Sequence, residues 1–334
     1  MVLMPALNEE ATIHSIIQTI KRDIPRSIPD LDELEIVVVD DGSTDNTAKI
    51  SRDSGASVVS HPTNQGVGAA IQTGLAEALK RRAEVTVNID ADGQFDPHDI
   101  PKLVAPIMSG EADFVTASRF KDPNIEPVMP SAKRWGNYCM SWLISKIAEQ
   151  KFHDVSCGFR AYSHETLLHL TLQGKFTYTQ ETFLTLAFKG LKIVEMPVSV
   201  RGAREFGKSR VANNLFHYGF QTLRIILGCV RDYRPVYFFG VIAGALAFIG
   251  LTLSAVFFGH FLWTGSFSPN LWIGFLGSFF ILLAVFAQLF GQIAAMLDRI
   301  RFLQEEQLYL LREFRHNVSS SSISRGTTHS KNTE

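Results

Sequence analysis

Two long apolar segments without charge constrain this chain more than any other feature of its sequence. Residues 236–263 carry no Asp, Glu, Lys or Arg over 28 positions, and residues 271–297 carry no titratable side chain over 27. About 20 apolar residues suffice to cross a hydrocarbon layer of roughly 30 Å. The core helices of water-soluble domains rarely stay uncharged for so long. The sequence therefore predicts two transmembrane helices that form a hairpin.

The charges that flank these segments predict their orientation. Five arginines lie close to their outer ends, whereas the linker 264–270 contains neither Lys nor Arg. These are Arg224, Arg231, Arg234, Arg299 and Arg301. Because positive residues favour the cytoplasmic side of a membrane, we expect an integral membrane protein with both termini in the cytoplasm.

Composition divides the rest of the chain. Residues 1–200 form a predicted cytoplasmic domain, and residues 201–235, with seven Lys and Arg against two acids, form a basic loop followed by interfacial amphipathic helices. Residues 298–315 are predicted as a cytoplasmic amphipathic helix whose apolar side chains could pair two chains in a homo-oligomer. The Ser-rich tail 316–334 is predicted to be disordered. A formal net charge of −1 argues against nucleic acid as a partner.

Short apolar runs alternate with amphipathic helical patterns in the first 120 residues. The predicted strands are 2–5, 35–40, 57–61, 84–90 and 113–118, and the predicted helices are 10–22, 45–54, 68–82 and 96–109. This alternation predicts an α/β fold with a mostly parallel sheet that helices cover on both faces. Ligands of such sheets bind at the carboxyl ends of the strands.

Two of the predicted strands end in carboxylates. The second ends in Asp40 and Asp41, and the fourth leads into the sequence DADGQ at 90–94. These groups would repel a diphosphate unless a cation lay between them. The candidate ligands of such a cation are Asp90, Asp92 and Gln94. Their oxygen atoms are of the kind that Mg²⁺ and Mn²⁺ prefer, so the sequence predicts a divalent metal site that holds a diphosphate.

Eight motifs of the chain occur in the order found in a known family. They are PALNEE at 5–10, DDGSTD at 40–45, NQGVGA at 64–69, DADGQ at 90–94, SRF at 118–120, SCGFRA at 156–161, EMPV at 195–198 and REFGKS at 204–209. Together they resemble the family 2 glycosyltransferases, in particular the polyprenyl-phosphate branch that includes dolichol-phosphate mannose synthase. The resemblance covers about residues 2–297. It implies a Rossmann-like GT-A domain followed by juxtamembrane amphipathic helices and a transmembrane hairpin.

The resemblance also implies a site for a nucleotide sugar. The donor would be bound by Pro5, Leu7, Glu9, Asp40, Asp41, Asp90, Ala91 and Asp92. Mg²⁺ or Mn²⁺ on its diphosphate would be held by Asp90, Asp92 and Gln94. Position 7 is often aromatic in the family and stacks on the base, so Leu7 departs from the pattern.

A second group of residues is implied for the acceptor. Its phosphate would meet Arg119, Lys133, Arg134, Arg204, Lys208 and Ser209. Asp92, Arg119 and Lys208 are the residues to which the resemblance assigns catalysis. Asp154 and Glu181 are candidates for contacts with sugar hydroxyls, although Glu181 would equally favour the N-terminus of a helix.

The implied reaction moves a hexose, such as mannose or glucose, from a UDP- or GDP-sugar to undecaprenyl or dolichyl phosphate, with inversion. The product, a polyprenyl-phosphate sugar, would supply cell-envelope glycans or protein glycosylation. A phosphate acceptor is already an anion at pH 7, so the reaction requires no strong general base. A divalent ion would stabilise the departing nucleoside diphosphate.

Three other interpretations remain open. The sequence GAREFGKS at 202–209 fits the P-loop pattern of nucleoside triphosphatases, although no further strands are predicted after it. Processive polysaccharide synthases share the acidic motifs, but their QxxRW signature is matched without its Trp at 221–225. A non-catalytic membrane subunit would need neither acidic strand end.

Overall fold

The computed structural model describes residues 1–29, 31–127, 129–170, 178–201, 224, 227–228 and 230–329. Their side chains are described up to residue 314, apart from Ala132. The chain divides into two compact units, Met1–Ile225 with Leu311–Glu334, and Ile226–Leu310. The predicted α/β domain falls in the first unit and most of the two long apolar helices in the second.

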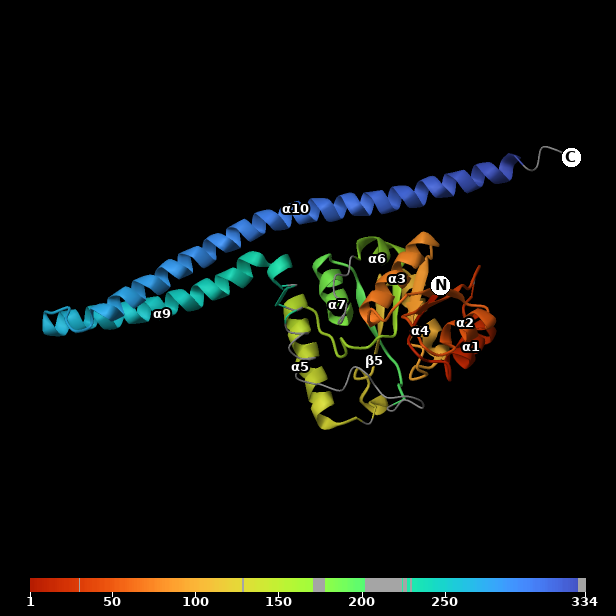
Figure 1. The fold of residues 1–334 in the computed structure, drawn as a ribbon, viewed down its shortest axis with the longest axis horizontal. Coiled ribbons are helices and arrows are strands. Elements are labelled where there is room, and N and C mark those ends of the chain that lie inside the picture. Colours follow the sequence, from red (N-terminus) through yellow and green to blue (C-terminus); the bar gives the residue numbers. More distant parts are fainter. Residues whose placement is uncertain are drawn as a thin grey trace. The chain divides into compact units, whose positions relative to one another are not determined.

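The first unit is built on a seven-stranded sheet that helices flank (Figure 1). The strands are β1 (Val2–Ala6), β2 (Ile36–Asp40), β3 (Ser57–Ser60), β4 (Val85–Asn88), β5 (Phe114–Ser118), β6 (Arg160–Ser163) and β7 (Ile193–Pro197), in the order β3-β2-β1-β4-β6-β5-β7. β1 pairs in parallel with β2 and β4, and β5 with β7, while β6 is antiparallel to β4 and β5. The strands other than β6 therefore end at the same edge of the sheet. The mostly parallel Rossmann-like domain is confirmed.

The helices of this unit follow the strands along the chain. They are α1 (Ile13–Ser27), α2 (Thr47–Asp53), α3 (Val67–Lys80), α4 (Ile100–Met108), α5 (Ser131–Ala148), α6 (His164–His169) and α7 (Tyr178–Phe188), with short 3₁₀ helices η1 (Pro97–Asp99) and η2 (Pro123–Ile125). The strand and helix patterns of the first 120 residues thus correspond to β1 to β5 and α1 to α4. The predicted fourth strand is shorter in the structure, because β4 ends at Asn88 and the chain turns away before the acidic motif.

Helical periodicity decides which faces are buried. α1 turns five isoleucines inward, namely Ile13, Ile16, Ile17, Ile20 and Ile24. They pack in one cluster with Val2 and Met4 of β1 and with residues of α4. Leu3 points to the opposite face because strand side chains alternate, and there α3 approaches so closely that a Cβ on Gly74 would lie 2.1 Å from Leu3 Cδ1. The sheet is therefore covered on both faces, as its apolar strands require.

β6 is a strand that the sequence analysis did not predict. Its four residues, RAYS, show no apolar run, and its register with β4 pairs Asn88 with Arg160. β5 pairs with the other edge of β6, so that Thr116 also lies opposite Arg160. This antiparallel insertion depends on contacts between residues about 40 to 80 positions apart, which a local pattern does not reveal.

The second unit contains α9 (Pro235–Thr264) and most of α10 (Leu271–His329). Both helices are long and apolar enough to cross a membrane by length and composition. They pack through small residues: a Cβ on Gly250 would lie 2.8 Å from Gly277 O, and one on Gly277 would lie 2.7 Å from Ser254 Oγ. Contacts of this kind allow close helix approach where no hydrophobic driving force acts.

α10 differs from the predicted division of the C-terminal region. It continues as one helix from Leu271 to His329. It therefore includes the segments 271–297 and 298–315 and extends into 316–334, for which the sequence predicts disorder. Extending an existing helix by one residue costs far less than nucleating a new one, which favours continuation over a break at 297.

Candidate active site

The loops after β1 and β2 are joined to each other by hydrogen bonds. The Asn8 amide donates to Ser43 Oγ at 2.9 Å, and the Thr44 amide donates to Asn8 Oδ1 at 2.8 Å. The Glu9 amide donates to Thr47 Oγ1 at 2.8 Å. The structure thus brings together four predicted donor-binding residues at two neighbouring strand ends: Pro5, Leu7, Glu9 and Asp40.

Asp41 has a different surrounding from its predicted one. Its buried carboxylate accepts hydrogen bonds from the amides of Gln65 at 2.9 Å and Gly66 at 2.8 Å, and it lies 2.7 Å from His61 Nδ1. Gly42 follows in a left-handed conformation, and a Cβ there would lie 2.7 Å from the Asn64 amide nitrogen. Asp41 therefore positions the loop 61–66 and does not present a free carboxylate to a nucleotide.

The acidic motif at 90–94 forms the next loop along this edge. Thr12 Oγ1, at the start of α1, donates to Ala91 O at 2.6 Å. Asp92 is 4% exposed, and its Oδ1 accepts a hydrogen bond from the Gln94 amide at 3.0 Å. The carboxylate of Asp90 lies against Gly158, where a Cβ would be 3.0 Å from Asp90 Oδ2. The loop is held at both of its acids.

The side-chain oxygens of this loop supply part of the ligand set that a divalent ion needs. Among the residues that the structure describes, no three His, Cys, Asp or Glu side chains form a group that could hold a metal by itself. Asp90 and Asp92 supply two hard carboxylates, which suits Mg²⁺ or Mn²⁺ that takes its other ligands from a diphosphate and from water. The side chain of Gln94 bonds to the backbone of another segment, since its Nε2 donates to Arg201 O at 3.2 Å.

The chain returns to this loop after β7. Val200 forms a bridge with Phe95, and the Arg201 amide donates to Gln94 O at 3.1 Å. The segment that follows carries Arg204, Lys208 and Ser209, which lie outside the described residues. Arg201, the last described residue before it, lies beside Gln94.

Arg119, directly after β5, is held by a buried carboxylate. Its Nε donates to Asp154 Oδ2 at 2.6 Å and its Nη2 to Asp154 Oδ1 at 2.9 Å. Nη2 also donates to Ser156 Oγ at 2.7 Å. Although full burial disfavours its charge, the Arg119 guanidinium and the surrounding amides hold the pKa of Asp154 below its usual range. Asp154 therefore orients Arg119, and the structure does not support its predicted contact with sugar.

Glu195 of β7 bonds to the backbone that carries Asp154. Its Oε1 accepts hydrogen bonds from the amides of His153 at 3.0 Å and Asp154 at 2.8 Å. Its Oε2 lies 2.8 Å from His153 Nδ1. The segments that carry Arg119, Asp154 and Glu195 are far apart in the sequence, and together they orient one guanidinium. The Arg119 side chain remains 17% exposed.

The first turn of α5 carries the two other predicted acceptor cations. Lys133 lies on the same face of α5 as Asn137, which accepts from the Ser156 hydroxyl to which Arg119 also donates. Partial burial and the charge of Arg119 lower the pKa of Lys133. Arg134 forms an ion pair with Glu126 and lies over the Tyr138 ring. The structure therefore groups Lys133 with Arg119 and directs Arg134 to a protein carboxylate.

Comparison with known proteins identifies the domain. Residues 1–170, just over half of the chain, match the family described as Glycosyl transferase family 2. The chain is a family 2 glycosyltransferase. This finding confirms the predicted family, and with it the predicted enzyme class.

Relatives of this glycosyltransferase act on lipid phosphates according to their names. It is 30% identical over 252 residues to the UDP-N-acetylglucosamine–dolichyl-phosphate N-acetylglucosaminyltransferase of Methanococcus voltae, covering 69% of this chain and 97% of the relative. It is 29% identical over 266 residues to the dodecaprenyl-phosphate galacturonate synthase of Rhizobium johnstonii, covering 74% and 73%.

Solved structures of a similar fold contain a metal ion and a nucleotide. One is glucosyl-3-phosphoglycerate synthase from Mycobacterium tuberculosis in complex with Mn²⁺, UDP and glucosyl-3-phosphoglycerate. Its sequence identity is 27%, its TM-score is 0.52, and the match covers 68% of this chain and 78% of that one. The same enzyme binds Mg²⁺ and UDP in another structure. Divalent metal use is therefore established among the neighbours of this glycosyltransferase.

Several residues that shape the site were not singled out from the sequence. Thr12 looks like a helix cap, but its hydroxyl bonds to Ala91 O instead. Asn137, one turn after Lys133 on α5, accepts from Ser156 Oγ at 2.5 Å. A Thr before a helix and an Asn within one carry no signal for such long-range contacts, although the i, i+4 spacing of Lys133 and Asn137 does place them on one helix face.

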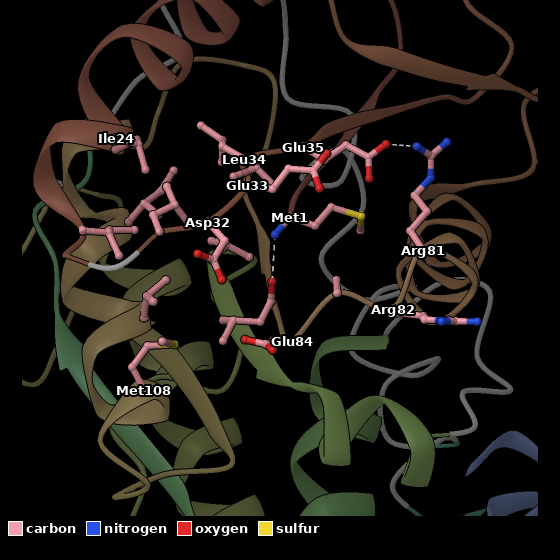
Figure 2. A pocket seen from close by; sticks show the side chains of 18 residues that line it. Met1, Ile24, Asp32, Glu33, Leu34, Glu35, Arg81, Arg82, Glu84 and Met108 are labelled. Carbon is pink, nitrogen blue, oxygen red and sulfur yellow. Dashed lines mark hydrogen bonds and ion pairs between the residues drawn. The ribbon is translucent and has the colours of Figure 1, made fainter. Parts of the chain in front are cut away.

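A cavity of about 290 Å³ lies at the opposite, amino end of the sheet. Figure 2 shows that Met1, Glu35, Arg81 and Glu84 line it, with Arg81 turned toward Glu35. The Met1 amino group donates to Val85 O at 2.9 Å, and burial lowers its pKa. The Met1 amino group and the Arg81 guanidinium thus have partners within the protein, and the cavity is separate from the strand ends that form the active site.

Cys157 provides a test of the loop between Asp154 and β6. Full burial, together with the charge of Asp154, raises the pKa of its thiol from 9.0 to about 12. The thiolate fraction at pH 8 should therefore be about 1000-fold lower than that of a free thiol. We expect iodoacetamide to leave Cys157 unmodified in the folded protein and to modify it after unfolding, as measured by peptide mass spectrometry. Rapid modification of Cys157 in the folded protein would contradict this packing.

Proposed function

We propose that this glycosyltransferase moves a hexose from a UDP- or GDP-sugar to the phosphate of a membrane-embedded polyprenyl phosphate. The reaction depends on Mg²⁺ or Mn²⁺ and inverts the anomeric carbon. The observation that carries the proposal is the position of Arg119, which Asp154 holds directly after β5 at the sheet edge that also carries Asp90 and Asp92. A guanidinium oriented in this way suits the phosphate of an acceptor.

The chain itself offers support for a lipid acceptor. α9 and α10 are long and apolar enough to span a bilayer. On α5, Trp135 and Trp142 are 71% and 63% exposed. Trp side chains are enriched at the interface between lipid and water. We propose that the catalytic domain and both termini are cytoplasmic, since the arginines flank the apolar segments and the linker 264–270 has none.

The donor would bind across the ends of β1, β2 and β4. Pro5, Leu7, Glu9 and Asp40 would contact the nucleoside, and Asp90, Ala91 and Asp92 would lie at the diphosphate. A bound Mg²⁺ or Mn²⁺ supplies charge neutralisation as a Lewis acid. Its protein ligands would be Asp90 and Asp92, and Gln94 would join them if its side chain leaves Arg201.

Arg119 and Lys133 would orient the acceptor so that a phosphate oxygen attacks the anomeric carbon opposite the departing diphosphate. Because this oxygen is already negative at pH 7, no residue needs to remove a proton. Arg204, Lys208 and Ser209 would close over the phosphates from the segment that begins at Arg201. Glu181 lies three residues after Tyr178 on α7 and so shares a helix face with it, and Glu181 would contact the sugar.

A donor and acceptor panel tests this function. The purified full-length protein in lipid nanodiscs would receive radiolabelled UDP-glucose, UDP-N-acetylglucosamine, UDP-galacturonate or GDP-mannose, with and without Mn²⁺. Parallel reactions would contain undecaprenyl phosphate, dolichyl phosphate or 3-phosphoglycerate. We expect Mn²⁺-dependent transfer of label into the organic phase with at least one donor. Label found only on 3-phosphoglycerate, or only in a water-soluble polymer, would overturn the lipid acceptor.

A further inference from the structure

Gly158 lies beside Asp90 just beyond the end of the ladder between β4 and β6. The last pair of the ladder is Asn88 with Arg160, so Asp90 and Gly158 lie in the loops that follow β4 and precede β6. The Asn88 side chain extends the contact, because its Nδ2 donates to Gly158 O at 2.6 Å. The first carboxylate of the acidic motif therefore faces the backbone of a loop more than 60 residues away.

A side chain at position 158 would crowd this carboxylate. A Cβ built on Gly158 would lie 3.0 Å from Asp90 Oδ2 and 3.3 Å from Asp90 Oδ1. It would also lie 3.3 Å from the hydroxyl oxygen of Tyr178. The backbone of Gly158 does not have the left-handed φ that favours glycine. A larger residue would therefore be disfavoured by its contacts with Asp90 and Tyr178 and not by its backbone conformation.

Arg160 holds both sides of this space. It is fully buried, and its Nε donates to Cys157 O at 2.8 Å while its Nη2 donates to Thr179 O at 3.1 Å. Its guanidinium also lies 5.4 Å from the centroid of the Tyr178 ring. The residue before Gly158 and the residue after Tyr178 thus bond to one side chain, so Arg160 links the two walls.

We propose that Gly158 and Tyr178 form a seat that fixes the Asp90 carboxylate in the orientation that binds the divalent ion, with Gly158 as its positioning residue. This inference rests on the proposed metal-binding role of Asp90. A carboxylate that is held before the metal arrives loses less side-chain entropy on binding, and partners behind a metal ligand commonly change affinity 10- to 100-fold.

The test measures Mn²⁺ binding directly. Full-length protein in nanodiscs would be titrated with Mn²⁺ in the presence of UDP or GDP, and free Mn²⁺ would be followed by electron paramagnetic resonance. We expect Gly158→Ala to weaken Mn²⁺ binding about 10-fold. Tyr178→Phe keeps the ring beside Arg160 and removes the hydroxyl that borders the same space, and should weaken binding about 3-fold because this wall loses its polar atom.

Gly136→Ala is the matched control, because a Cβ at Gly136 would meet nothing within 4 Å. It should bind Mn²⁺ as the unsubstituted protein does. Protection of Cys157 from alkylation would show that the loop remains folded in Gly158→Ala. If the loop of Gly158→Ala is not folded, Tyr178→Phe serves as the test. Unchanged Mn²⁺ affinity in a folded Gly158→Ala or in Tyr178→Phe would overturn the seat. Absence of Mn²⁺ binding in the unsubstituted protein would instead overturn the metal role of Asp90.

Discussion

Replacing Asp92 by Asn should lower the rate of sugar transfer by about 100- to 1000-fold, in line with the loss of one preorganised charge at a developing anion. Asp92 is almost fully buried, and the Gln94 amide directs one of its oxygens. The amide side chain of Asn preserves the shape and one acceptor oxygen. What it removes is the negative charge that would hold the divalent ion on the departing diphosphate.

The measurement is the initial rate of label transfer to lipid at saturating donor, over a range of Mn²⁺ concentrations. Asp96→Asn is the control, since Asp96 lies in the same stretch of chain but is exposed and accepts from the His98 amide. It should keep its rate within a small factor. If Asp92→Asn transfers sugar at the rate of the unsubstituted enzyme, Asp92 has no role in the reaction.

Replacing Asp154 by Asn should lower the free energy of unfolding of the catalytic domain by about 3–5 kcal/mol. The Asp154 carboxylate is fully buried and receives two hydrogen bonds from one guanidinium, at 2.6 Å and 2.9 Å. Without the charge of Asp154, the largely buried Arg119 guanidinium loses the carboxylate to which its Nε and Nη2 donate. Acceptor use should fall as well, because Arg119 loses the partner that orients it.

The same pair predicts how stability depends on pH. The pKa of Asp154 in the folded protein is lowered from 3.8, the value of an unperturbed Asp side chain. Its contribution to stability is therefore complete above about pH 4 and is lost as the pH falls through the lowered pKa. Denaturant unfolding between pH 3 and pH 7 should show a smaller acid-induced loss in Asp154→Asn than in the unsubstituted protein. Equal losses would contradict the assignment.

A double replacement separates stability from catalysis. Removing both charges in Arg119→Met with Asp154→Leu replaces the ion pair by apolar groups of similar size, which commonly costs little stability. We expect this protein to unfold at denaturant concentrations closer to those of the unsubstituted protein than either single variant does. It should remain inactive toward polyprenyl phosphate, and restored transfer would show that Arg119 has no part in acceptor binding.

Local pattern alone predicted the order of strands and helices in the first 120 residues. Their apolar runs have the period of their element and depend on few distant contacts, so β1, β2 and the amphipathic α1 could be anticipated. β6 could not, because its residues pair with strands on both sides that lie far along the chain. The resemblance carried by the eight motifs was confirmed for the family.

The sequence by itself determined the chemistry available to this protein: two acidic strand ends, a set of cations and two uncharged apolar helices. Only the tertiary structure decided where each charge points. It turned Asp41 toward the amides of 65–66, and Asp154 toward Arg119. The physical reason is that a residue type specifies which bonds a side chain can make, whereas its partner depends on which distant segments packing brings beside it.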